Sequence, residues 1–183
     1  MNEIEIIKGC KNLDASCQRM LVNRYSGLLF SVSRRYCGDD FSAKEALQEG
    51  LIRIFKSIQT FDSKKGSFEG WMKKIVANES IKIIRKQKKT RTEEIDSVLM
   101  PTSVPNAIDH LHEEELVRLI QGLPIGYREV FNMYVIDGYS HKEISRELNI
   151  SESTSRSQLT RAKKLLQQRI TMIENLQLCR KKA

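Results

Sequence analysis

Apolar and small side chains in this chain recur at intervals of three and four residues, which restricts the backbone to helices. The clearest stripe lies in 43–58 and consists of Ala43, Ala46, Leu47, Gly50, Leu51, Ile54, Phe55 and Ile58. This spacing matches the 3.6-residue turn of an α-helix, whereas a half-buried strand alternates every two residues. No segment shows that alternation. The sequence therefore predicts an all-α fold.

Other segments show the same period. Residues 14–37, 112–122 and 126–137 are amphipathic, and a further helix is predicted over 67–88 with Ser67 as its N-terminal cap. The apolar stripe of this last helix consists of Phe68, Trp71, Met72, Ile75, Val76 and Ile83. We expect Trp71 to pack within that stripe rather than to stack on a ligand.

The segment 140–166 has the layout of a helix-turn-helix. Ser140 and Glu143 form a capping-box pattern that opens a short helix, and a turn follows at Asn149. Ser151 caps a longer helix, whose inward stripe consists of Ser155, Leu159, Ala162 and Leu166. The outer face of this helix contains Ser153, Arg156, Ser157, Thr160, Arg161 and Lys164. In a helix-turn-helix the second helix enters the major groove, where such side chains contact base edges and phosphates.

Charge is segregated along the 183 residues, whose net charge is +8. Counted from the sequence, residues 71–92 have a charge of +7, residues 93–115 of −7 and residues 138–183 of +6. Basic faces on helices indicate a polyanionic partner, and nucleic acid is the leading choice. The acidic stretch contains Pro101 and Pro105 and is typical of a flexible linker. We expect small helical domains at 1–92 and 112–183, joined by a linker at 93–111.

Several other classes of protein do not fit the sequence. It has no nucleophile and base arrangement and no glycine-rich phosphate loop, so we expect neither an enzyme nor a cofactor. The four cysteines form no C-x-x-C pair, and His110 and His112 lack a full ligand set, so we expect no metal. No apolar run could span a bilayer and no secretory signal opens the chain. We expect a cytoplasmic protein that does not insert into membranes.

Three motifs, which lie at 44–55, 61–78 and 138–166, resemble in sequence and in order the motifs of a known family. This family is the extracytoplasmic-function (ECF) sigma factors of the bacterial sigma-70 family, and the features are typical of its Bacteroidetes members. KEALQEGLIRIF at 44–55 resembles conserved region 2.2. Residues 61–68, followed by GWMKKIVAN at 70–78, resemble regions 2.3 and 2.4. The helix-turn-helix at 138–166 resembles region 4.2, and the resemblance as a whole covers 10–172.

The resemblance implies a sigma factor that binds core RNA polymerase through its beta-prime and beta subunits and that recognises and melts promoter DNA. The residues it implies for the polymerase contact are Gln48, Glu49, Ile52 and Arg53. Those implied for the minus-ten element are Phe61, Lys64, Lys65, Lys73, Lys74, Asn78, Lys82, Arg85 and Lys86. The outer face of the second helix of the helix-turn-helix is implied to read the minus-thirty-five element. An anti-sigma factor is a further possible partner.

The chain departs from the family pattern at two places. Ser155 stands where the family usually has an apolar residue, and SIKI at 80–83 replaces the more common acidic and aromatic run. An alternative interpretation is a helix-turn-helix transcriptional regulator that does not act as a sigma subunit. A protein-interaction adaptor without a DNA role is a third class, but it would not account for two basic faces.

Overall fold

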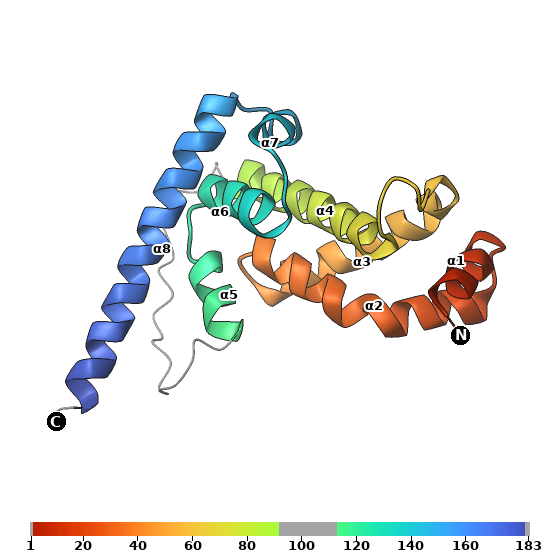
Figure 1. The fold of residues 1–183 in the computed structure, drawn as a ribbon, viewed down its shortest axis with the longest axis horizontal. Helices are drawn as coiled ribbons and strands as arrows, with labels where there is room; N and C mark the ends of the chain where they lie inside the picture. Colours follow the sequence, from red (N-terminus) through yellow and green to blue (C-terminus); the bar gives the residue numbers. More distant parts are fainter. Residues whose placement is uncertain (1, 92–112, 182–183) are drawn as a thin grey trace. The chain divides into compact units, whose positions relative to one another are not determined.

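The computed structural model describes residues 2–91 and 113–181, and these form helices and short connections without any strand (Figure 1). The chain divides into two compact units, Met1–Asp96 and Ser97–Ala183. The all-α prediction is therefore confirmed. The predicted linker at 93–111 lies outside the described residues, as do His110 and His112. No helix in the described ranges is both long and apolar enough to cross a membrane.

Within residues 2–91, the first unit consists of four α-helices and a short 3₁₀ turn. Their bounds are α1 Glu3–Lys11, α2 Ala15–Tyr36, α3 Asp40–Ser57, η1 Ile58–Thr60 and α4 Phe68–Arg91. Asp14 and Asp39 cap α2 and α3, because each carboxylate accepts hydrogen bonds from backbone N–H groups of the first turn. Ser67 does the same for α4, since its Oγ accepts from the N–H of Gly70.

The core of the first unit lies between α2, α3 and α4, which pack against one another (Figure 1). Leu29, Ile54 and Met72 are among its fully buried side chains, one from each helix. The backbones of α3 and α4 approach closely at Gly50, where an added Cβ would lie 2.7 Å from Cγ2 of Val76 and 3.3 Å from its Cα. Only glycine leaves room for this crossing without a shift of α4.

Within residues 113–181, the second unit contains α5 Glu113–Gln121, α6 Ile125–Phe131, the π-helical turn η2 Asn132–Ile136, α7 His141–Leu148 and α8 Glu152–Lys181. The predicted capping box of Ser140 and Glu143 opens α7. Asn149 follows α7 in the left-handed conformation, with a φ of 52°. This residue type tolerates that conformation, so the turn of the predicted helix-turn-helix is confirmed.

The four predicted inward residues of α8 are all buried. Leu123, Ala162 and Leu166 form a cluster against which Leu119, Tyr127 and Phe131 pack. Beyond this cluster, the guanidinium of Arg169 donates to the backbone carbonyls of Leu119 and Gly122, at 3.3 and 2.9 Å. These bonds satisfy carbonyls at the end of α5, which have no partner within the helix.

Two elements differ from the sequence prediction. Helix α1 was not expected, and the segment 126–137 is an α-helix followed by a π-helical turn rather than one regular helix. The π turn widens the backbone ladder, and the N–H of Asp137 bonds to the carbonyl of Asn132. Tyr134, Val135 and Ile136 are exposed on this turn.

Candidate nucleic-acid interface

The outer face of α8 is the first candidate surface for nucleic acid. Its six predicted residues are all exposed and follow one another at helical spacing. The hydroxyls of Ser157 and Thr160 donate to backbone carbonyls one turn earlier, at 2.9 and 3.1 Å. A serine or threonine hydroxyl in this arrangement keeps lone pairs that face outward, and it can rotate to serve a ligand.

The two arginines of this face have partners within the unit. Arg156 pairs with Glu152 one turn before it, at 3.2 Å, and Nη1 of Arg161 lies 3.4 Å from the hydroxyl of Tyr127. Both arginines are exposed. An exposed i,i+4 ion pair is worth less than about 1 kcal/mol, so phosphate or guanine can replace the carboxylate at little cost.

A histidine connects the turn η2 to both helices of the helix-turn-helix. The ring of His141 stacks on Tyr134 with centroids 4.4 Å apart, and its Nδ1 lies 2.9 Å from Oγ of Ser155. Ser155 is 0% exposed. Desolvation, followed by the charge of Arg156, lowers the pKa of His141, and Glu152 acts in the opposite direction. The buried hydroxyl of Ser155 thus has the imidazole of His141 as its hydrogen-bond partner, as a buried polar group requires.

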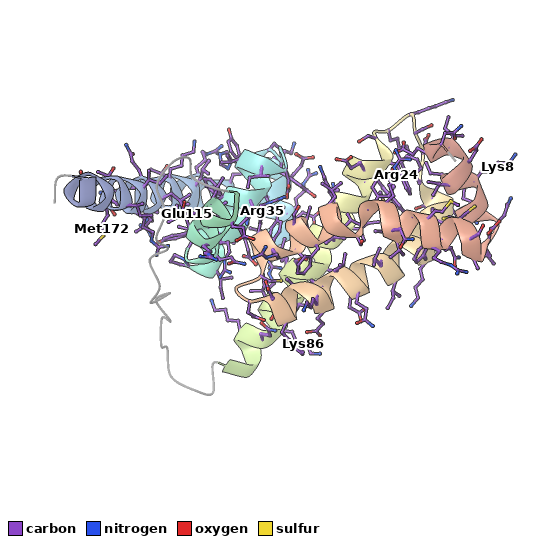
Figure 2. All side chains as sticks on the ribbon, turned by 90° about the horizontal axis from the view of Figure 1, so that it is seen from below. Lys8, Arg24, Arg35, Lys86, Glu115 and Met172 are labelled. Carbon is purple, nitrogen blue, oxygen red and sulfur yellow. The ribbon has the colours of Figure 1, made fainter. Side chains whose placement is uncertain are left out.

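Helix α4 provides the second candidate surface. Lys74, Asn78, Lys82 and Arg85 follow one another at spacings of three and four and share one face; all are exposed except Asn78, which is half-buried. Lys86, also exposed, extends this face (Figure 2). Two lysines have acidic neighbours: Lys73 pairs with Glu69 at 2.6 Å and Lys82 with Glu79 at 2.7 Å.

The segment that departs from the family pattern, 80–83, lies on the buried side of α4. Ser80 is buried and its Oγ donates to the carbonyl of Val76 at 2.8 Å. Ile81 and Ile83 are buried as well. Lys82 alone points outward from this segment.

The loop before α4 presents two exposed lysines, Lys64 and Lys65. It is ordered by Asp62, whose Oδ1 accepts from the N–H of Lys64 at 3.0 Å and whose carbonyl accepts from the N–H of Lys65 at 3.0 Å. Such a turn is the local structure that Asp favours. The loop directly precedes α4 in the chain, so its lysines and the basic face of α4 belong to the same unit.

Phe61 differs from the DNA-facing position expected for it. Its side chain is 9% exposed, and its ring packs against Phe68 and Trp71 with centroids 5.0 and 5.4 Å apart. An aromatic ring at the start of a loop gains more from burial against two other rings than from exposure. The expected packing of Trp71 is confirmed, since its ring also stacks on Phe68 at 5.7 Å.

A third surface lies on α3, where Gln48, Glu49, Ile52 and Arg53 are all exposed. Ile52 is 39% exposed among these polar neighbours. The structure adds Phe41, which is 79% exposed in the first turn of the same helix. Residues 41, 45, 48 and 52 share one helical stripe. The sequence reasoning missed Phe41 because it precedes the apolar stripe; its position seven residues before Gln48 was the available signal.

Within the described ranges, no group of three or more His, Cys, Asp or Glu side chains is placed to hold a metal ion. Cys10, Cys17 and Cys37 are buried cysteines. Burial raises the pKa of Cys10 to about 11, with further contributions from Cys17 and Asp14, so its thiol is protonated at neutral pH.

Two family models match the chain, one in each unit. The model described as Sigma-70 region 2 matches residues 21–90, and the model described as Sigma-70, region 4 matches residues 113–166. The first match includes α3, the loop and α4, and the second includes the helix-turn-helix. The surfaces described above thus lie within the regions that define sigma-70 proteins.

Relatives that match over most of the chain show to which group of sigma-70 proteins it belongs. The ECF RNA polymerase sigma factor SigM of Bacillus subtilis is 30% identical over 153 residues, which cover 81% of this chain and 89% of the relative. The ECF RNA polymerase sigma factor SigE of Mycolicibacterium smegmatis is 28% identical over 152 residues, and there the match spans 80% of this chain but only 58% of the relative. The chain belongs to the ECF RNA polymerase sigma factors.

Solved structures share the fold. The sigma factor RpoE of Bartonella quintana, in complex with the anti-sigma factor NepR, has a TM-score of 0.57 at 17% identity, over 84% of this chain and 96% of that one. CnrH, in complex with the cytosolic domain of CnrY, has a TM-score of 0.52 at 18% identity, over 91% of this chain and 96% of that one. At these identities the likeness concerns the fold.

Proposed function

We propose that this sigma factor binds core RNA polymerase through the outer face of α3 and reads promoter DNA at two elements, one with each unit. The observation that supports this most directly is the presence of two exposed basic helix faces in two separate compact units. A sigma factor performs no covalent chemistry, so binding energy alone must select the promoter and open it. Each surface is therefore assigned a binding step.

The α3 surface is suited to a protein partner. Glu49 and Arg53 provide one charge of each sign at i,i+4 spacing, and Ile52 adds apolar area between polar neighbours. An apolar centre with a polar rim is the usual composition of a protein interface. We assign Gln48, Glu49, Ile52 and Arg53 to the polymerase contact, and Phe41 extends this surface by one further apolar side chain.

The loop and the basic face of α4 are suited to the minus-ten element. Extruding a base from a duplex costs a few kcal/mol in stacking and pairing, and a protein must recover this through contacts to the opened strand. Lys64 and Lys65 are the exposed cations of the loop, and Asn78 has an amide able to read a base edge. The phosphate contacts are assigned to Lys73, Lys74, Lys82, Arg85 and Lys86.

Helix α8 is suited to the minus-thirty-five element in the major groove. Arg156 and Arg161 can each make bidentate contacts to guanine or single contacts to phosphate. Ser153, Ser157, Thr160 and Lys164 add hydroxyl and charged contacts along the same exposed face. Phosphate contacts fix the register of the helix, and base contacts provide the sequence information.

We further propose the bounds of the functional domains, the place where the protein acts and one more partner. The functional domains are 1–92 and 112–183, and the acidic segment between them connects the two DNA contacts. The protein acts in the cytoplasm, where polymerase and chromosome are found. An anti-sigma factor is a further partner, which is supported by the solved structure of a sigma factor of this fold in complex with one.

The promoter is first mapped from the start site of a transcript that appears when this protein is overproduced. Transcription from that promoter is then reconstituted with core RNA polymerase and the purified protein. Exchanging the charges of α3 with Glu49→Arg and Arg53→Glu is expected to abolish co-purification with core enzyme and transcription together. The control is Arg19→Glu, an exposed change on α2 that should leave both intact. Surface changes of this kind alter stability by less than about 0.5 kcal/mol.

Two outcomes would contradict the proposal. If the exchanged variant binds core enzyme like the wild type, α3 is not the polymerase contact. If the wild-type protein binds the mapped promoter alone and regulates transcription by another sigma factor, without supporting initiation itself, the chain is the helix-turn-helix regulator of the alternative interpretation.

A further inference from the structure

The loop that carries Lys64 and Lys65 begins at a residue held on both its side chain and its backbone. The ring of Phe61 packs on Phe68 and Trp71, and its carbonyl accepts a hydrogen bond from Nζ of Lys11 at 3.1 Å. The two partners of this bond are 50 residues apart in the chain. The donor belongs to α1, which lies before residue 21, where the match to Sigma-70 region 2 begins.

The contact between α1 and the start of the loop is reciprocal. While Lys11 donates to Phe61, the side-chain amide of Gln59 donates to the carbonyl of Lys11. Lys11 is the last residue of α1, so its carbonyl has no partner within the helix. Each segment therefore satisfies a backbone carbonyl of the other, and the end of α1 is tied to η1 and to the first loop residue.

Helix α1 is itself firmly attached to the unit. Ile6 and Cys10 are buried, and the hydroxyl of Tyr25 donates to Glu3 at 2.6 Å. The ring of Tyr25 lies edge-on to Phe68 at 6.0 Å. Phe68 also contacts Phe61. Helix α1 is therefore connected to the start of the loop in two ways: directly through Lys11, and indirectly through Tyr25 of α2 and Phe68 of α4. A displacement of α1 would pull directly on the start of the loop.

Lys11 is not one of the residues assigned to phosphate: its ammonium donates to the Phe61 carbonyl, and its side chain is half-buried. A group that holds the first residue of a short loop acts instead on the residues that follow. Asp62 then sets the turn that presents Lys64 and Lys65. The position of these two lysines depends on where the loop begins.

We propose that α1 is part of the promoter-reading machinery, and that Lys11 is a positioning residue that places the loop 61–67 for the minus-ten element. This inference rests on the proposed function of that loop. It assigns a role in DNA recognition to a helix that contributes none of the assigned DNA contacts. The loss of the Lys11 ammonium should therefore affect promoter opening and minus-ten discrimination, while core binding and minus-thirty-five recognition stay unchanged.

The test uses holoenzyme assembled from core RNA polymerase and the full chain, with Lys11→Met as the main variant. Methionine retains most of the apolar stem and removes the donor. Lys8→Met is the matched control, an exposed lysine on the same helix with the same change of charge (Figure 2). The measurements are the rate of open-complex formation on the mapped promoter and the loss of rate caused by single base changes in its minus-ten and minus-thirty-five elements.

Lys11→Met is expected to slow opening about tenfold and to reduce discrimination at minus-ten bases, the scale expected for one lost hydrogen bond to a charged group. Lys11→Arg should restore both, since its guanidinium can donate to the same carbonyl. Discrimination at the minus-thirty-five element should not change in any of these variants. Gln59→Leu, which removes only the reciprocal bond, should give a smaller loss in the same direction and keeps the test valid if Lys11→Met folds poorly.

The outcomes separate this inference from the function on which it rests. A double variant Lys64→Ala and Lys65→Ala tests the loop itself, and an unchanged opening rate there would overturn the assignment of the loop and this inference together. If that variant is impaired while Lys11→Met matches Lys8→Met, only the positioning role is wrong. A lowered melting temperature of Lys11→Met with unchanged opening and discrimination would show a purely structural contact and would also overturn it.

Discussion

The hydrogen bond between His141 and Ser155 shows how a polar side chain is accommodated in the helix-turn-helix core. A buried hydroxyl without a partner costs about 1–3 kcal/mol, and the imidazole nitrogen at 2.9 Å supplies that partner. The same ring stacks on Tyr134, so one side chain joins η2, α7 and α8. Ser155 directly precedes Arg156, and the histidine therefore supports the backbone next to a proposed DNA contact.

This arrangement predicts a pH dependence of stability for the second unit. Burial and Arg156 lower the pKa of His141 below its ordinary value of 6.5, against the smaller opposing effect of Glu152. The unfolded chain then binds the proton more readily than the folded chain. The stabilisation is fully present above pH 6.5 and is lost as the pH falls through the folded pKa.

The measurement is the free energy of unfolding from denaturant titrations at pH 7.5 and pH 5. The control is the double variant His141→Phe and Ser155→Ala, which removes the titrating group and its buried partner together. The wild type should lose more stability than this variant on acidification. Equal losses would mean that carboxylates elsewhere account for the whole effect.

The exposed guanidinium of Arg156 is proposed to contact DNA directly. Arg156→Ala should weaken binding to promoter DNA with an intact minus-thirty-five element by about 1–3 kcal/mol, the range for one good bidentate base contact. Arg118→Ala is the matched control, since it also removes an exposed arginine paired with a glutamate one turn away, at 3.8 Å. Affinities measured over a series of salt concentrations provide the test. If the control variant loses as much affinity as Arg156→Ala, general charge and not this contact is responsible.

At the scale of elements, the crossing of α3 and α4 depends on one glycine. Gly50→Ala should destabilise the first unit by about 1–3 kcal/mol, because the new methyl group would meet Val76 at 2.7 Å. Gly27→Ala is the control in the exposed middle of α2, where nothing lies within 4 Å. It should stabilise the unit by about 0.5–1 kcal/mol through helix propensity. Chemical denaturation distinguishes them, and a neutral or stabilising Gly50→Ala would contradict the close approach.

Helices with a wide apolar stripe could be predicted from the sequence, because the side of each helix that is buried is the side on which apolar residues recur. Residues 43–58 and 67–88 correspond to α3 and α4 within a few residues, and the caps at Ser67, Ser140 and Ser151 are present. The outward residues of α8 followed from the same period. Local spacing sets these features, and tertiary contacts only reinforce them.

Features that depend on distant contacts could not be predicted in this way. Helix α1 has nine residues, too few for its pattern to stand out, and it is stabilised by Tyr25 and Gln59 from elsewhere in the chain. The burial of Phe61 depends on rings seven and ten residues later. The pairing of Ser155 with His141 spans 14 residues and two helices, so sequence alone showed only a polar residue in an apolar stripe.

The chain has two compact units, and each contains one of the proposed DNA contacts, so the proposed promoter recognition is bivalent. A covalent connection makes the second DNA contact intramolecular, which raises its effective concentration. Fragments 1–92 and 112–183, produced separately, should each keep their helical circular dichroism. Their mixture should bind core enzyme through the first fragment but lose most transcription from promoters that need the upstream element.

The intact protein at equal concentration is the reference in that comparison, and a promoter that does not require the minus-thirty-five element is the control template. Transcription by the mixture should recover on the control template. A mixture as active as the intact chain on both templates would show that the connection adds nothing. Loss of helical structure in either isolated fragment would show that the two units do not fold independently.

The crossing at Gly50 also has a mechanical meaning. With α3 assigned to the polymerase and α4 to the promoter, the first unit connects the polymerase to the DNA. Where the backbones of α3 and α4 approach this closely, few side-chain atoms lie between them that could deform. A stiff joint transmits a displacement almost undiminished, whereas a soft one would absorb it as repacking. Movement of the polymerase during strand separation would thus reach the DNA-facing helix as a rigid rotation of the whole unit.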